Sequence, residues 1–120
     1  MDLAKLFKST EDSKTFPAGT TIFEEGQPGD FMYVVQQGEV EIRRGAETLE
    51  VVSAGGIIGE MALIDNSARS ATTVARTDST LVAIDVKRFT FLVQQTPYFA
   101  IHLLRVLVDR LRRTTDRAIR

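Results

Sequence analysis

The chain has 120 residues, of which 43% are hydrophobic and 26% are charged, and its formal net charge is −1. This length fits one domain, and the composition excludes disordered and fibrous proteins. The near-balance of charges argues against a domain that binds polyanions over its whole surface. No stretch has the run of apolar residues that a membrane helix needs, and we find no secretory signal. Together with the absence of cysteine, this predicts a cytoplasmic location.

Catalytic and metal-binding side chains are scarce. The chain has no cysteine and one histidine, His102. Disulfides and cysteine nucleophiles are excluded, and a histidine-based metal site is not expected. No nucleophile stands beside a base in the pattern. We therefore expect no enzyme, no catalytic residue, no cofactor and no metal, and we expect His102 to be a half-exposed helix residue.

The first two thirds of the chain are predicted to be mainly β-structure. A short N-terminal helix is indicated by the i, i+3, i+4 spacing of Leu3, Leu6 and Phe7. From about residue 15 to 85, short β-branched runs alternate with glycines, which is typical of an antiparallel sandwich or barrel. A hairpin turn is expected at Gly45, where glycine supplies a positive φ.

The last third is predicted to be helical, because it has no glycine and one proline. We expect one helix over residues 86–95 and a long one over 97–119, since Thr96 precedes Pro97 and is disfavoured in the helical region. The predicted fold class is α+β, mainly β. It consists of one domain over residues 1–120, with an antiparallel β-roll or jelly roll, a short N-terminal helix and two C-terminal helices.

The long helix carries an apolar row with heptad spacing: Ile101, Leu104, Val108, Leu111, Thr115 and Ala118. This row favours a homodimer in which Leu104, Val108, Leu111 and Thr115 face the partner. The alternative is a helix buried broadly against its own core. Six arginines and two aspartates lie between residue 105 and the end. No aromatic residues interleave with them, so we expect a solvated face or a partner contact, and no nucleic-acid binding by this chain alone.

Residues 55–71 depart from a plain β pattern. Glycines end a strand, a short run of helix formers begins at Glu60, and Arg69 follows among small residues. Unpaired N–H groups of a helical turn, a close backbone approach at glycine and an arginine together suit a phosphate. Glu60 would repel a phosphate but suits a sugar hydroxyl, which indicates a nucleotide. The alternative is a turn, one turn of helix and an exposed strand arginine.

Two motifs resemble those of the cyclic-nucleotide-binding domains. Gly59 to Leu63, followed after five residues by Arg69 to Thr72, is similar to the family's phosphate-binding cassette. The stretch from Gly19 to Val40 resembles its other signature, and the two motifs occur in the family's order. The resemblance implies an eight-stranded β-roll flanked by helices.

The same resemblance implies roles for individual residues. Arg69 and Ser70 would bind the cyclic phosphate, and Glu60 would accept a hydrogen bond from the ribose 2′-OH. The backbone of Ala62 would meet the phosphate region. The implied ligand contacts are Gly59, Glu60, Met61, Ala62, Arg69, Ser70 and Ala71. Pocket walls or core are implied for Ile58 and Leu63, and turn scaffold for Gly26, Gly29, Asp30 and Gly38.

The long helix resembles the dimerisation helix of the family's bacterial cAMP-receptor transcription activators. There, a polar pair reads the adenine, and here that pair would be Thr114 and Thr115. The alternative is that the two threonines mark a helix end that becomes solvated. The activators continue into a helix-turn-helix domain, which we do not expect these 120 residues to supply.

The resulting expectation is a cyclic-nucleotide sensor. Ser70 follows the pattern of the cAMP-binding activators, whereas many cGMP sites carry threonine there, so cAMP is preferred over cGMP. Two alternatives stay open: a sensory part of a larger DNA-binding regulator, and a dimerisation scaffold that binds no nucleotide. One departure from the family is Thr73, where an apolar residue is preferred. A buried threonine costs little if its hydroxyl finds a carbonyl.

Overall fold

The structure is a computed structural model that describes residues 13–119, with side chains as far as residue 113. The predicted N-terminal helix at Leu3 to Phe7 lies outside the described residues. The chain divides after Val86 into two compact units, which are taken separately below. The prediction of one domain over residues 1–120 stays a prediction.

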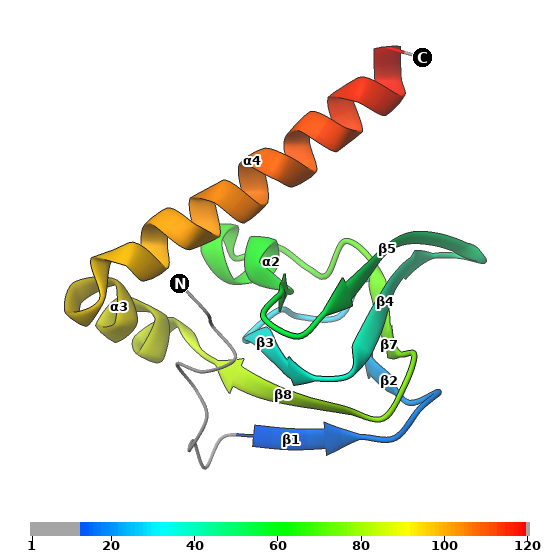
Figure 1. Cartoon of the computed structure of the whole chain (residues 1–120), viewed down its shortest axis with the longest axis horizontal. Coiled ribbons are helices and arrows are strands. Elements are labelled where there is room, and N and C mark those ends of the chain that lie inside the picture. Colours follow the sequence, from blue (N-terminus) through cyan, green and yellow to red (C-terminus); the bar gives the residue numbers. More distant parts are fainter. Residues whose placement is uncertain (1–12, 120) are drawn as a thin grey trace. The chain divides into compact units, whose positions relative to one another are not determined.

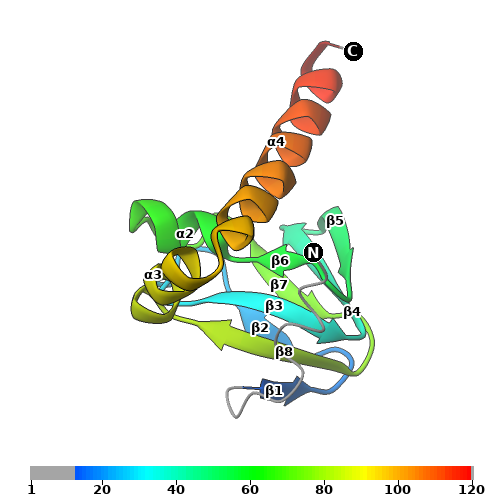
Figure 2. The same ribbon diagram turned by 60° about the vertical axis from the view of Figure 1, so that its left-hand side comes forward.

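The first unit is an antiparallel β-roll of two four-stranded sheets (Figures 1 and 2). Their orders are β1-β8-β3-β6 and β2-β7-β4-β5, and all pairs are antiparallel. This arrangement confirms the fold class and the eight strands that the sequence led us to expect. The strands are β1 (Ser13–Phe16), β2 (Thr21–Phe23), β3 (Met32–Gln37), β4 (Glu39–Arg44), β5 (Glu47–Ser53), β6 (Ile57–Ile58), β7 (Thr72–Ala75) and β8 (Ser79–Ile84).

Both sheets contribute to the core of the roll. One buried cluster joins residues of β3, β6 and β8 to residues of β4 and β5: Tyr33, Val35, Val40, Val52, Ile58 and Leu81. Alternation along β4 produces this arrangement, because successive side chains point to opposite faces of a strand. Val40 is fully buried in the cluster.

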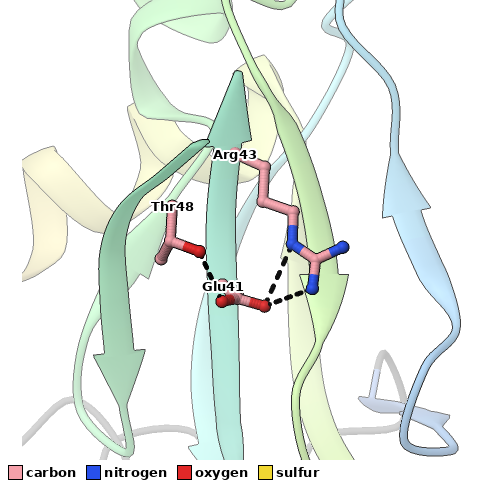
Figure 3. Close-up of polar contacts among 3 residues, drawn as sticks. All are labelled: Glu41, Arg43 and Thr48. Carbon is pink, nitrogen blue, oxygen red and sulfur yellow. Dashed lines mark hydrogen bonds and ion pairs between the residues drawn. The ribbon is translucent and has the colours of Figure 1, made fainter. Parts of the chain in front are cut away.

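The opposite face of β4 is polar. Glu41 accepts hydrogen bonds from Arg43 Nε and Nη2 at 3.0 and 2.6 Å and from Thr48 Oγ1 at 2.6 Å (Figure 3). These bonds from Thr48 and Arg43 hold the pKa of Glu41 below its ordinary value. The network ties β4 to β5 beside the turn at Gly45, whose φ of +60° confirms the predicted hairpin.

The second unit consists of helices α3 (Val86–Gln95) and α4 (Pro97–Ile119). The break lies at Thr96, as predicted. The ring of Phe99 on α4 meets that of Phe89 on α3 edge to face, with centroids 5.7 Å apart. His102 is half-buried, as expected. No helix in the described part of the chain is long and apolar enough to span a membrane.

The heptad row on α4 is exposed where its side chains are described. The exposed fractions of Leu104, Val108 and Leu111 are 60%, 44% and 66%. Thr115 and Ala118 belong to the helix backbone, but their side chains lie outside the described residues. The row therefore presents apolar surface of the kind that a partner helix covers.

Candidate functional site

The cassette predicted from the sequence lies between β6 and β7 and contains the helix α2 (Glu60–Asp65) (Figure 1). Gly59 is its N-cap residue and has a φ of +75°, which favours glycine. The helix ends where Asn66 takes a left-handed conformation and Asp65 accepts hydrogen bonds from the backbone and hydroxyl of Ser67. The Asp-Asn-Ser cluster thus ends the short helix.

Arg69 is enclosed by the roll, with 5% of its surface exposed. Its Nη1 donates to the carbonyl of Gly59 at 3.0 Å, and its Nη2 donates to the carbonyl of Phe31 at 2.6 Å. The guanidinium carbon lies 4.0 Å from the ring centroid of Phe23. An exposed strand arginine, which was the alternative for this residue, is therefore wrong.

Burial and nearby groups act on the pKa of Arg69 in opposite directions. Burial lowers the pKa of Arg69, while Tyr33, Asp30 and Glu60 act in the opposite direction through their charges. Glu60 is itself buried, with 2% of its surface exposed. The predicted carboxylate and guanidinium are thus both buried and close enough to interact through their charges.

The Nε atom of Arg69 differs from its two Nη atoms, which both donate hydrogen bonds. This Nε is buried and has no hydrogen-bond partner among the described residues. Buried donors in native proteins are nearly always paired, and an unpaired one on a charged group costs more than a neutral one. Within the described residues, this Nε–H is thus a buried donor whose acceptor is missing.

The backbone around Arg69 is joined to the first sequence motif. Gly26 N donates to the Arg69 carbonyl at 2.9 Å, and Arg69 N donates to the Gln27 carbonyl at 2.8 Å. Pro28 and Ala68 form an isolated β-bridge. The two motifs, far apart in the sequence, thus lie side by side in the fold.

Gly29 packs against α2. A Cβ at this position would lie 2.1 Å from the Cβ of Ala62, so no larger residue fits without a shift of the backbone. The scaffold role expected for this glycine is explained by this close approach of the loop after β2 to the cassette helix.

The remaining predicted contacts lie in different surroundings. Ala62 and Ala71 are buried, whereas Met61 is 55% exposed and Ser70 is exposed. The Ser70 carbonyl accepts a hydrogen bond from Arg44 Nη2 at 3.1 Å. The side chains of Thr114 and Thr115 lie outside the described residues. As ligand contacts, all these residues stay predictions.

Three neighbours of Arg69 were not identified from the sequence. The ring of Phe23, the carbonyl of Phe31 and the side chain of Tyr33 all lie near its guanidinium. Asp30, taken as scaffold, also acts on this guanidinium electrostatically. No sequence spacing signals these contacts, because they depend on how β2 and the start of β3 pack against the cassette.

Thr73 lies on β7 and is 1% exposed. Its hydroxyl has no hydrogen-bond partner in the part of the chain that the structure describes. The condition under which this departure from the family would cost little is therefore not met. Ile58 and Leu63 are buried, in agreement with a core role. No group of three or more metal-ligating side chains occurs within residues 13–113.

Comparisons with known proteins agree with the fold. A CRP-like cAMP-activated global transcriptional regulator of Mycobacterium tuberculosis is 33% identical over 106 residues, which cover 84% of this chain and 47% of that protein. The cGMP-dependent protein kinase egl-4 of Caenorhabditis briggsae is 37% identical over 78 residues, or 65% of this chain and 10% of the kinase. The crystal structure of the Thermus thermophilus catabolite activator protein matches with a TM-score of 0.82 at 31% identity, over 98% of this chain and 56% of that one.

This chain thus spans about half or less of the length of these curated relatives. The sequence profile of the cyclic nucleotide-binding domain matches residues 13–96, which is more than half of the chain. The predicted family resemblance is confirmed, and the chain belongs to the cyclic nucleotide-binding domain family.

Proposed function

We propose that this chain is a sensor module that binds cAMP in preference to cGMP, with Arg69 as the main contact to the cyclic phosphate. The observation that carries the proposal is the buried, unpartnered Nε of this arginine. A phosphate oxygen would supply the missing acceptor through a charge-assisted hydrogen bond. In this proposal Ser70 and the backbone of Ala62 complete the phosphate contacts.

Glu60 is proposed to bind the ribose. Its side chain is buried, and its charge acts on the guanidinium of Arg69. A ribose 2′-OH is a donor that a carboxylate can accept, and it lies next to the phosphate in a cyclic nucleotide. A phosphate and a hydroxyl recognised together favour a nucleotide over a free anion.

The preference for cAMP rests on Ser70. Relatives at similar identity include one named for cAMP and one named for cGMP, so relatedness does not decide between the two ligands. The serine follows the pattern of the cAMP-binding activators. Because a hydroxyl is present in either case, the preference is expected to be modest.

The output of the sensor is proposed to pass through α4. Its exposed apolar row, with Leu104, Val108 and Leu111, supports a homodimer built by this helix. Thr114 and Thr115 would contact the base, so that binding of the nucleotide would affect the position of α4. Only a difference in contacts between the two states of the helix can shift its position. We place the module in the cytoplasm and assign it no chemistry of its own.

Isothermal titration with cAMP and cGMP tests the binding proposal. We expect saturable binding that Arg69→Ala weakens at least tenfold, since a charge-assisted bond contributes about 1.5–3 kcal/mol. Arg76→Ala is the matched control, because this exposed arginine comes directly after β7, which Arg69 precedes, and the variant has the same change in charge. No binding by the folded wild type would favour the scaffold alternative, and equal binding by Arg69→Ala would refute the role of that residue.

Sedimentation analysis tests the dimer. Leu111→Glu introduces a charge into the exposed row and is expected to give a monomer. Arg113→Glu changes an exposed residue of the same helix outside the heptad row and is expected to leave the dimer intact. A wild type that sediments as a monomer with and without nucleotide would refute the dimer.

The alternative of a sensory part within a larger DNA-binding regulator agrees with the coverage of 47% of the regulator from M. tuberculosis.

A further inference from the structure

The face of the Phe23 ring lies against the guanidinium of Arg69. Phe23 is the last residue of β2, and its ring centroid lies 4.0 Å from the guanidinium carbon of Arg69. Its ring also stacks on that of Tyr33, with centroids 6.2 Å apart and planes inclined by 20°. Tyr33 belongs to the buried core cluster, against which Phe23 also packs. The core therefore fixes where this ring lies.

The ring and the two carbonyls restrain different motions of the guanidinium. Hydrogen bonds to the carbonyls of Gly59 and Phe31 fix the positions of its Nη1 and Nη2 atoms, respectively. Neither bond prevents a tilt of the plane, because carbonyl acceptors tolerate a broad range of directions. A ring face 4.0 Å from the guanidinium carbon opposes such a tilt. The same face offers partial negative charge to a cation that burial has removed from water.

From this geometry we infer that Phe23 is a positioning residue for the phosphate site: its ring holds the Arg69 guanidinium so that the unpartnered Nε stays available to the ligand. The inference rests on the proposed function. It goes beyond it by assigning a role to a residue that would not itself touch the nucleotide. An aliphatic residue at position 23 would fill the core but would neither orient nor stabilise the cation.

Replacement of the ring tests this role. Phe23→Leu is expected to weaken cAMP binding about five- to thirtyfold, the range that corresponds to a partly or fully desolvated cation–π contact. Phe23→Tyr keeps the ring face and is expected to bind within about twofold of the wild type. Phe23→Met, with a more adaptable side chain, replaces the leucine variant if that variant does not fold. Phe16→Leu is the matched control, because Phe16 also packs against the core cluster, whereas the ring that faces the arginine is that of Phe23.

A double-mutant cycle separates positioning from general packing. In an Arg69→Ala background, Phe23→Leu is expected to cause no further loss of affinity, because the group that the ring orients is absent. Urea denaturation of each variant shows the fraction folded, so that affinities are compared for folded protein.

The outcomes distinguish the two proposals. Binding by the wild type that Arg69→Ala loses but Phe23→Leu retains would overturn the inference alone. Equal losses in Phe23→Leu and Phe23→Tyr, an equal loss in Phe16→Leu, or a full further loss in the Arg69→Ala background would also overturn it. A folded wild type that binds neither cAMP nor cGMP would overturn the proposed function and this inference with it.

Discussion

Gly59→Ala displaces the guanidinium without removing it. A Cβ at Gly59 would lie 2.5 Å from Arg69 Nη1 and 3.3 Å from the carbonyl oxygen of Phe31. The backbone there has a φ of +75°. Gly45 provides a matched control, because its φ is +60° but a Cβ there would meet nothing within 4 Å. The two alanine variants share the backbone strain, and only Gly59→Ala changes the contact with the arginine.

The expected magnitudes follow from these contacts. A left-handed conformation costs a residue with a Cβ about 1–2 kcal/mol, so both variants should lose about that much free energy of unfolding. In Gly59→Ala, Nη1 must withdraw by about 1 Å to reach an ordinary contact distance. That shift breaks its 3.0 Å hydrogen bond to the Gly59 carbonyl. If the shift costs the ligand one charged hydrogen bond, worth about 1.5–3 kcal/mol, affinity falls roughly ten- to a hundredfold.

Two measurements separate the effects. Urea denaturation is expected to give similar losses of stability for Gly59→Ala and Gly45→Ala. Isothermal titration with cAMP is expected to give the large loss of affinity for Gly59→Ala only. Equal affinity in both variants, with both folded, would refute the argument that the position of this guanidinium limits binding.

Three further changes test the packing and the surface network. Thr73→Val replaces a buried hydroxyl that has no partner among the described residues by a methyl group. Urea denaturation should show a gain of about 1 kcal/mol in the free energy of unfolding, and the affinity for cAMP should not change. A loss of stability would reveal a partner for the hydroxyl. Gly29→Ala would bring its Cβ to 2.1 Å from that of Ala62, so it should lower the free energy of unfolding by about 1–3 kcal/mol. Ala62→Gly in the same chain should restore part of this loss. A thermal midpoint of Gly29→Ala equal to that of the wild type would contradict the close approach. Glu41→Gln should lower the unfolding midpoint at neutral pH only. The hydrogen bond from Thr48 holds the pKa of Glu41 below its ordinary value. The carboxylate therefore stabilises the fold at pH values above the ordinary pKa, and this stabilisation is lost as the pH falls through the lowered pKa. A difference in unfolding midpoint between Glu41→Gln and the wild type that does not depend on pH would contradict this cause.

The fold could be predicted because its signals are local. Glycines and short β-branched runs indicated the strands, and the Thr96-Pro97 pair indicated where one helix ends and the next begins. The turn at Gly45 has the positive φ that its sequence predicted. These features depend on neighbours within a few residues, and periodicity reports such neighbours directly.

The site could be predicted only in part, because its contacts are long-range. The pattern identified Arg69 and Glu60 but not the ring and the carbonyl that hold the arginine. Phe23 and Phe31 belong to a motif some forty residues earlier, and their apolar side chains suggest core packing rather than a role beside a cation. The unpaired hydroxyl of Thr73 could not be predicted either, since a sequence does not show whether a buried threonine reaches a carbonyl.

The contacts that hold Arg69 are divided between the two sequence motifs. The cassette supplies Arg69, but the earlier motif supplies the Phe31 carbonyl and the Phe23 ring that hold its side chain. The backbone of Arg69 is also hydrogen-bonded to Gly26 and Gln27 of that earlier motif. A change in either motif therefore reaches the same charged group. A related chain that keeps the cassette arginine but has lost the ring or the loop should bind the phosphate less well, because an arginine binds a phosphate strongly only where its donors are already oriented.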